Sequence, residues 1–323
     1  MSIIKLSETD LSPVKSKILN NLKKQPYVSG EFLSSQLNVS RTAIWKNIQG
    51  LANLGYQIDP IKGKGYRLVV IPDNLYPWEL DFSLKKDYQI TYFDNIDSTN
   101  NYARSLQPPQ VVIAEQQTKG RGRMGRAWFS APGGIYFSLV ITPRCSVDEI
   151  PTIPLLISTA ITKVLKRELG IQAEIKWPND ILVQGQKVTG ILVELAGETD
   201  APQKAVIGVG INANQNTNLF PEELKKSVTS LRELNCSPVN RKLMLNSILE
   251  EITQLFFELP NCIPKVLNTW KEYSCTLGKK ITVKQVSKTI TGIAKDIDRS
   301  GALIVETPQG EQRILTGDLS INI

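Results

Sequence analysis

One short basic segment carries the residue types best suited to chemistry in this sequence. Residues 117–126 read QTKGRGRMGR and contain no acidic side chain. Glycine lets the backbone form turns that other residues avoid, and guanidinium groups present forked donors that match carboxylate and phosphate oxygens. This basic loop therefore predicts an anion clamp, with a solvated loop that binds no ligand as the alternative. Its cations are Lys119, Arg121, Arg123 and Arg126.

The glycines of the basic loop also match the GxGxxG spacing of dinucleotide-binding proteins. That site needs a helix directly after the glycines, because the helix N-terminus holds the pyrophosphate. Here Pro132, Gly133 and Gly134 follow, so no helix is expected. The spacing therefore does not predict a dinucleotide site.

Composition excludes several classes of site. The 323 residues include no histidine, which excludes a Ser-His-Asp triad, a Cys-His pair and a histidine-ligated metal. A general base must be a carboxylate, a lysine or water, and a metal is expected only as Mg²⁺ arriving with a nucleotide. The four cysteines form no CxxC pair, which favours a reduced, cytoplasmic protein. No signal peptide and no membrane span are expected, since apolar runs of about 18 residues are missing.

A second polar cluster lies at Asp97-Ser98-Thr99-Asn100, after a predicted strand at residues 88–93. Ser98 is suited to cap the helix that we expect over residues 99–106. Small polar side chains at such a corner suit a polar ligand, and they equally suit capping alone.

The elements that must position these groups mix strands and helices irregularly, which favours an α+β domain. We expect strands at 135–141 and 174–183, the latter broken at Pro178-Asn179-Asp180. A hairpin then leads into the strand that begins at Lys187. The strand at 205–211 contains Gly208 and Gly210 and ends at Asn212. Glycines inside a strand let another backbone or a ligand come close, so we expect such an approach here. A capping box at Ser146 and Glu149 is expected to start a helix reaching Leu169, and further helices are expected at 241–258 and 264–273.

The N-terminal region carries most of the positive charge. Residues 1–70 hold ten Lys or Arg and four Asp or Glu, a net of +6 out of +7 for the whole chain, which points to nucleic acid. Helices are expected at 12–25, 29–37 and 41–51, and Ser40 caps the third. A helix-turn-helix spanning Ser29 to Ile48 follows, with outward side chains at Ser40, Arg41, Thr42, Trp45 and Lys46.

A basic hairpin follows this helix-turn-helix. Lys62 and Lys64 lie at its turn, where they can contact phosphate like the wing of a winged helix. The alternative is a three-helix packing module with a solvated basic face.

From Gly278 onward the sequence pattern predicts only β-strands and turns. Short strands bounded by turn residues predict a small barrel, with strands at residues 280–284, 289–297, 302–306 and 312–315. We therefore expect domains at residues 1–72, 73–275 and 276–323.

Five motifs at these spacings resemble the bifunctional biotin–protein ligases, which also repress biotin biosynthesis operons. They read GRGRMGRAWFS, DSTN, KWPND, KVTGILVEL and GVGIN. The resemblance covers nearly the whole chain. It implies a winged helix-turn-helix, a central α+β biotin/lipoate ligase-like domain of class II synthetase type, and an SH3-like barrel.

The resemblance also implies a two-step reaction. Biotin and Mg·ATP give biotinyl-5′-AMP, and a lysine of a biotin carboxyl carrier protein then accepts the biotin. Lys187, Arg121 and Asp180 are the implied catalytic residues. The implied ligand-binding residues are Ser98, Thr99, Asn100, Gln117, Arg121, Gly122, Arg123, Trp128, Lys187, Gly190 and Asn212.

In such a protein the adenylate-bound form is a homodimer that binds operator DNA. Met124 stands where the family loop usually has arginine. The alternatives are a lipoate or octanoate ligase, a transcription factor with a degenerate ligand-sensing domain, and a biotin ligase that no longer binds operator DNA.

Overall fold

The computed structural model describes residues 4–7, 10–83, 85–198, 201–285 and 287–321. It divides the chain into two compact units. The smaller unit holds residues 6–78, and the larger holds residues 79–323 together with the N-terminal residues up to Lys5. The division into three domains at residues 72 and 275 stays a prediction.

The smaller unit is built from three helices and a hairpin. Their bounds are α1 Pro13–Lys24, α2 Gly30–Leu37, α3 Arg41–Ala52, β2 Gln57–Ile61 and β3 Gly65–Val70. Ser12, Ser29 and Ser40 cap the helices, each accepting a hydrogen bond from the backbone N–H three residues later. The predicted order of helices, turn and wing is confirmed.

The turn between α2 and α3 depends on a left-handed residue. Asn38 has φ +52°, a conformation that asparagine tolerates better than most residues. At the base of the hairpin, Gly65 has φ +99°, and a Cβ there would lie 2.3 Å from the Val28 carbonyl oxygen. Val28 and Tyr66 exchange backbone hydrogen bonds of 2.9 Å. A glycine at 65 is therefore needed for the hairpin to dock on the helices.

A mixed sheet forms the centre of the larger unit, in the order β4-β5-β6-β10-β9-β8-β7. Lys5, the first residue of β1 (Lys5–Ser7), extends it beside β4. Only β4 and β5 are parallel within this run. The bounds are β4 Gln89–Phe93, β5 Gln110–Ala114, β6 Ile135–Ile141, β7 Glu174–Lys176, β8 Asp180–Val183, β9 Gln186–Glu198 and β10 Ala201–Ile211.

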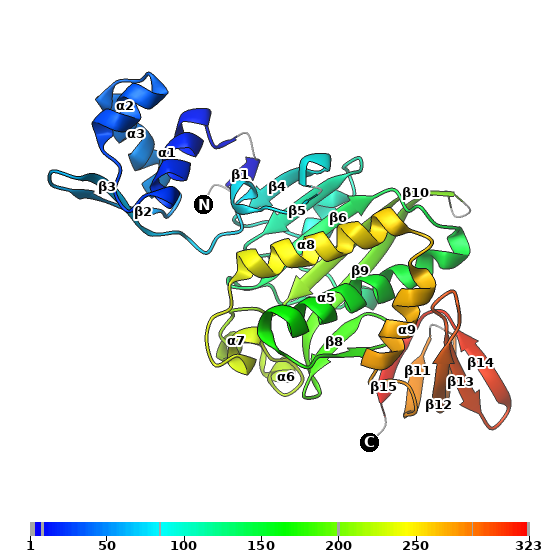
Figure 1. Ribbon diagram of the computed structural model, residues 1–323. Helices are drawn as coiled ribbons and strands as arrows, with labels where there is room; N and C mark the ends of the chain where they lie inside the picture. Colours follow the sequence, from blue (N-terminus) through cyan, green and yellow to red (C-terminus); the bar gives the residue numbers. More distant parts are fainter. Residues whose placement is uncertain (1–3, 8–9, 84, 199–200, 286, 322–323) are drawn as a thin grey trace. The chain divides into compact units, whose positions relative to one another are not determined.

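Long helices cover one face of this sheet. In Figure 1, α5 (Ile153–Leu169) and α8 (Arg241–Glu258) lie side by side across it, and α9 (Ile263–Tyr273) packs on α5. The predicted α8 and α9 are confirmed. Among the described residues, no helix has the length and apolar character needed to cross a membrane.

Three details differ from the sequence predictions. The capping box of Ser146 and Glu149 is present, but it opens a 3₁₀ helix at Val147–Thr152 instead of α5. Pro151 explains this, because it has no N–H to bond back to the first turn of an α-helix. The helix after Ser98, α4, covers only Thr99–Ala103 and does not reach Leu106. Short helices at η6 Thr217–Leu219, α6 Glu222–Lys225 and α7 Leu231–Leu234 were not predicted.

The C-terminal part forms a five-stranded antiparallel sheet, in the order β14-β13-β12-β11-β15. Its strands are β11 Lys280–Lys284, β12 Thr289–Ile297, β13 Leu303–Thr307, β14 Gly310–Ile314 and β15 Asp318–Ile321. Four of them were expected, and β15 was missed. Ile281, Val283, Leu303 and Val305 are fully buried in its core.

Candidate functional site

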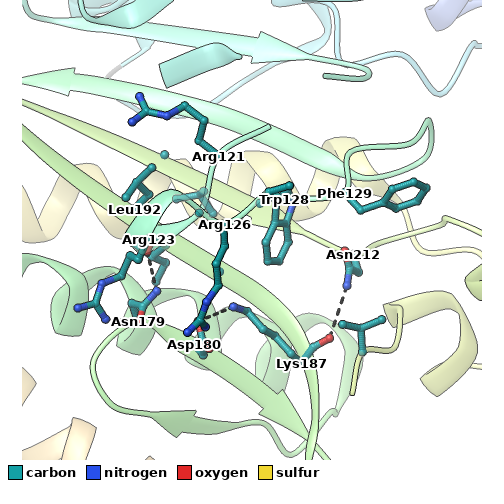
Figure 2. A pocket seen from close by; sticks show the side chains of 18 of the residues that line it. Arg121, Arg123, Arg126, Trp128, Phe129, Asn179, Asp180, Lys187, Leu192 and Asn212 are labelled. Carbon is teal, nitrogen blue, oxygen red and sulfur yellow. Dashed lines mark hydrogen bonds and ion pairs between the residues drawn. The ribbon is translucent and has the colours of Figure 1, made fainter. Parts of the chain in front are cut away.

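A cavity of about 410 Å³ lies over the central strands of the larger unit. Its walls come from α4, the basic loop, β8 and β9, the end of β10, and residues 317–318 at the start of β15 (Figure 2). Every residue expected from the resemblance to bind ligand or to act in catalysis lines this cavity. These are Ser98, Thr99, Asn100, Gln117, Arg121, Gly122, Arg123, Trp128, Asp180, Lys187, Gly190 and Asn212.

Lys187 lies near the start of β9, where it is paired with Leu182 of β8 on one side and with Val228 on the other. Its backbone N–H donates to Ser227 O at 2.8 Å, and its carbonyl accepts from Thr229 N at 3.1 Å. The side chain reaches Asp180 of β8, with 2.7 Å between Nζ and Oδ1. The ammonium also lies 5.2 Å from the centroid of the Trp128 ring. A half-buried cation with one carboxylate partner can bind a developing negative charge.

The basic loop contains one 3₁₀ turn, η4 (Arg123–Gly125), and no helix longer than this turn. The next element is strand β6, so the expected absence of a helix after the glycines is confirmed. Met124 has φ +56° in this turn and its side chain is 59% exposed. The loop closes on itself through a hydrogen bond of 2.8 Å from Gly122 N to Arg126 O.

Two arginines of the basic loop contact segments that lie far away in the sequence. Arg123 donates to Asn179 Oδ1 and to Thr316 Oγ1, each at 2.9 Å. Arg126 forms an ion pair with Asp318 at the start of β15. Burial lowers the pKa of Arg123, and the charges of Asp180 and Asp318 oppose that change.

Arg121 has different partners. It donates to Asn101 Oδ1 at 3.0 Å and pairs with Glu194 at 3.2 Å. Figure 2 shows its side chain pointing away from Lys187 and Asp180. The structure therefore brings Lys187, Asp180 and Arg123 together, and holds Arg121 at the other end of the cavity.

The polar corner serves as a helix cap and as part of the cavity wall. Ser98 Oγ accepts from Asn101 N, which caps α4. Thr99 N donates to Gln117 Oε1 at 2.8 Å, and Ser138 Oγ donates to Asn100 Oδ1 at 2.6 Å. Thr99 and Asn100 are buried, so their orientations are fixed before a ligand arrives.

Glycines in β9 and β10 make room for side chains on the cavity floor. A Cβ at Gly190 would lie 2.7 Å from the Trp128 ring, and one at Gly210 would lie 2.3 Å from Trp128 Nε1. At Gly208 a Cβ would lie 2.2 Å from Asn100 Oδ1. Another backbone or a ligand was predicted to approach the glycines of β10, and in the structure the side chains of Asn100 and Trp128 do so. Trp128 Nε1 is buried without a hydrogen-bond partner in the described part of the chain, which leaves a donor for a ligand.

Sequence reasoning missed an apolar wall and several polar partners. Phe129 and Phe220 have ring centroids 5.1 Å apart, and Leu224 and Val228 continue their surface into the cavity. Asn179 belongs to the KWPND motif and Phe129 follows Trp128, so both had a signal. Glu194 also had a signal, since it belongs to the KVTGILVEL motif. The remaining missed residues had none, because they come from distant segments of the chain: Phe220, Leu224, Val228, Thr316 and Asp318.

In the smaller unit, the face predicted to bind DNA is open. Arg41, Thr42, Trp45 and Lys46 are exposed on α3, and Trp45 is 53% exposed. Arg41 pairs with Glu31 at 3.0 Å, and both side chains are well exposed. Lys62 and Lys64 lie at the turn between β2 and β3, with Lys64 Nζ 4.9 Å from the Tyr27 ring.

No group of three or more His, Cys, Asp or Glu side chains suited to a metal ion occurs within the described ranges.

Three family models match the chain. The Biotin/lipoate A/B protein ligase family matches residues 92–212, an HTH domain matches residues 14–67, and the Biotin protein ligase C terminal domain matches residues 276–321.

Curated relatives match along nearly the whole length. The bifunctional ligase/repressor BirA of Bacillus subtilis is 35% identical over 305 residues, which cover 91% of this chain and 94% of that protein. Its Escherichia coli counterpart is 30% identical, with 95% and 97% covered. Among solved structures, a biotin protein ligase from Aquifex aeolicus in complex with biotin and ATP is 28% identical. It has a TM-score of 0.61, and the match covers 72% of this chain and 98% of that one.

Proposed function

The chain belongs to the family of bifunctional biotin protein ligases and repressors, and we propose that it activates biotin with ATP and transfers it to a carrier protein. The observation that carries this proposal is the position of Lys187. It lies in a single cavity between a cationic loop, a polar corner and an apolar wall. Such a cavity suits a ligand with a polar head, a central anion and a flat apolar end.

In the first step, a carboxylate oxygen of biotin attacks the α-phosphorus of ATP. A new P–O bond forms, the bond to the bridging oxygen breaks, and pyrophosphate leaves with its electron pair. Lys187 supplies positive charge where the carboxylate meets the phosphate, and Arg123 adds a second cation from the basic loop. Lys187 can shift from Asp180 to the ligand, because it is held there by one ion pair.

The two ends of the cavity suit the two ends of the product, biotinyl-5′-AMP. Ser98, Thr99, Asn100 and Gln117 offer donors and acceptors to the biotin head group. Phe129, Phe220 and Val228 offer an apolar surface to adenine. Trp128 lies between these ends, with an Nε1–H that has no hydrogen-bond partner among the described residues, and Asn212 lines the same cavity. The basic loop covers the reactive anhydride and limits its hydrolysis.

In the second step, the neutral ε-amine of a carrier lysine attacks the acyl carbon. An amide bond forms, the bond between the acyl carbon and the AMP oxygen breaks, and AMP leaves. Asp180 is suited to orient the amine and to accept its proton once Lys187 has turned to the phosphate.

The remaining parts of the proposal concern cofactor, partners and location. Mg²⁺ would arrive with ATP and offset phosphate charge, since the protein offers no carboxylate cluster among its described residues. The accepting partner is a biotin carboxyl carrier protein. We place the protein in the cytoplasm, in agreement with the absence of paired cysteines in the described structure.

The same chain is proposed to repress transcription. The exposed polar face of α3 and the basic wing suit a major groove and its flanking phosphates. Two copies, joined when the adenylate is bound, would place two such helices on a palindromic operator. Operator affinity should therefore rise when biotin and ATP are added. Unchanged affinity would leave a biotin ligase without repressor activity.

Pyrophosphate exchange into ATP tests the enzyme class. Purified protein with Mg²⁺ is assayed with biotin, lipoate and octanoate in parallel. Exchange with biotin alone is the expected result. Exchange with lipoate or octanoate, but not biotin, would assign the chain to the sister ligases. No exchange with any acid would favour a sensor without ligase activity.

A further inference from the structure

Glu194 of β9 lies next to the cavity but does not line it. Its side chain is 18% exposed, and it faces α4 and the basic loop. In the sheet it stands opposite Val206 of β10, so its backbone position is fixed by strand pairing on that side. A largely covered carboxylate beside the cavity, with no place in the two chemical steps, needs its own explanation.

Three side chains converge on this carboxylate. Asn100 Nδ2 donates to Oε2 at 3.0 Å, Arg104 Nη2 donates to Oε1 at 2.5 Å, and Arg121 Nη2 lies 3.2 Å from Oε1. Asn100 and Arg104 belong to α4 and its C-terminal cap, whereas Arg121 belongs to the basic loop. One carboxylate therefore ties the polar corner to the basic loop.

The contact with Asn100 also fixes which way its amide points. A carboxylate only accepts hydrogen bonds, so the Asn100 amino group must face Glu194. The amide oxygen then faces Ser138, whose hydroxyl donates to it at 2.6 Å. Ser138 also lies 2.8 Å from Thr99 Oγ1, which in turn donates to Gln117 Oε1 at 3.1 Å. The network therefore runs from Glu194 through Asn100, Ser138 and Thr99 to Gln117.

The charge state of Glu194 supports this role. Burial by itself would raise the pKa of the carboxyl group. Hydrogen bonds from Arg104 and Asn100, together with the charges of Arg121 and Arg104, outweigh that effect and hold the pKa below its ordinary value. The group is therefore ionised at neutral pH and can hold both arginines.

We propose that Glu194 is a positioning residue that aligns Asn100 with Arg121, so that the polar corner and the basic loop hold biotin and its adenylate together. The inference rests on the proposed function and deepens it. Glu194 touches neither substrate nor reacting atoms, and it acts through the two side chains that line the cavity.

The test is Glu194→Gln in the full-length protein. Glutamine keeps the size of the side chain, but it removes the charge and turns an amino group toward one of the donors. Losing one charge-assisted hydrogen bond predicts a biotin Kd about 10-fold higher, measured by calorimetry. The half-life of the adenylate complex should fall by about the same factor. The rate of pyrophosphate exchange at saturating biotin should stay within about 2-fold, because Lys187 and Arg123 are untouched.

Glu306→Gln is the matched control. It replaces the same residue type in another strand, β13. The change removes an exposed ion pair, in which Glu306 Oε2 lies 2.9 Å from Lys295 Nζ. It should bind biotin like the wild type. Glu194→Asp keeps the charge on a shorter side chain, and it is expected to recover part of the lost affinity. Wild-type affinity and adenylate lifetime in Glu194→Gln would overturn the proposal.

A double-mutant cycle separates positioning from general destabilisation. Asn100→Ala and Glu194→Gln should be less than additive in biotin Kd, because the part of the Glu194 effect that acts through Asn100 is already lost. Additive losses would also overturn the proposal. If Glu194→Gln does not fold, Arg104→Gln replaces it in the cycle, since that side chain is half-exposed. Failure of the wild type itself to bind biotin would instead contradict the proposed function.

Discussion

At the scale of single residues, Lys187 is the group on which the proposed chemistry depends most. Its ammonium is held by Asp180 at 2.7 Å and lies over the Trp128 ring at 5.2 Å. Both contacts fix a positive charge at the middle of the cavity. The positive charge is thus already at the site when the phosphate and carboxylate meet, and Lys187 turns from Asp180 to bind them.

Lys187→Ala should therefore abolish adenylate formation, with pyrophosphate exchange lower by about 100-fold or more. Lys187→Arg should not restore normal activity, because a planar fork does not reproduce a compact ammonium. Lys225→Ala is the control, since Lys225 pairs with Glu222 on the short helix α6. Normal exchange in Lys187→Ala would exclude the assigned role.

The cysteines allow a test of the structure by pH. Burial raises the pKa of Cys145 and of Cys275 to about 11, with Glu149 and Glu174 adding to the effect. The thiolate is the reactive form, so a raised pKa means slow alkylation at neutral pH. Iodoacetamide at pH 8 should label the exposed Cys236 first. Labelling of Cys145 and Cys275 should speed up with each pH step until about pH 11, as followed by mass spectrometry of the peptides. Fast labelling of Cys275 at pH 8 would contradict its burial.

At the scale of elements, the basic loop is held closed by the C-terminal sheet. Arg123 donates to Thr316, and Arg126 pairs with Asp318 at the start of β15. These contacts join segments about 190 residues apart in sequence. The C-terminal sheet therefore contributes to the active site, in addition to any stabilising role.

Asp318→Asn should shorten the lifetime of the adenylate, because it releases Arg126 from the sheet. The unfolding free energy should change by no more than about 1 kcal/mol, since the pair is largely exposed. Lifetime is measured by chasing labelled adenylate from the protein, and stability by thermal unfolding. Asp296→Asn, which breaks a pair between β12 of the same sheet and Lys271 of α9, should leave the lifetime unchanged. An equal effect of both variants would argue against the closing role of Asp318.

At the scale of the whole molecule, positive charge is concentrated in the N-terminal region, which carries +6 of the total of +7. The cavity thus binds anions through a few cations at fixed positions, whereas the smaller unit has a general excess of positive charge. Such an excess favours DNA binding that weakens as salt releases counterions.

Lys62→Ala with Lys64→Ala should lower the slope of log affinity against log salt by about 2, because each lysine is expected to neutralise one phosphate. The slope is measured by titrating operator DNA at several salt concentrations. Lys295→Ala, on the C-terminal sheet, is the control. Pyrophosphate exchange should be unchanged in the double variant, and an unchanged slope would mean that the hairpin does not contact DNA.

The sequence by itself determined most of the elements and many of the residues that line the cavity. The Ser40 cap, the apolar face of Ile44, Ile48 and Leu51, and the bounds of β11 follow local rules, in which a hydroxyl, a helical period or an alternating strand is enough. The motifs also indicated which residues gather around Lys187. Local patterns of this kind do not depend on the rest of the chain, so they predict local structure without knowledge of the tertiary contacts.

Only the tertiary structure decided how those residues face one another. Pairing across β8 and β9 brings Asp180 to Lys187, and Glu194 reaches Arg121 instead of solvent. Strand β15 escaped prediction because it is four residues long and takes its place from pairing with β11. In a sheet, a shift of one residue turns a side chain to the opposite face. Contacts between distant segments depend on that register, and no local periodicity encodes it.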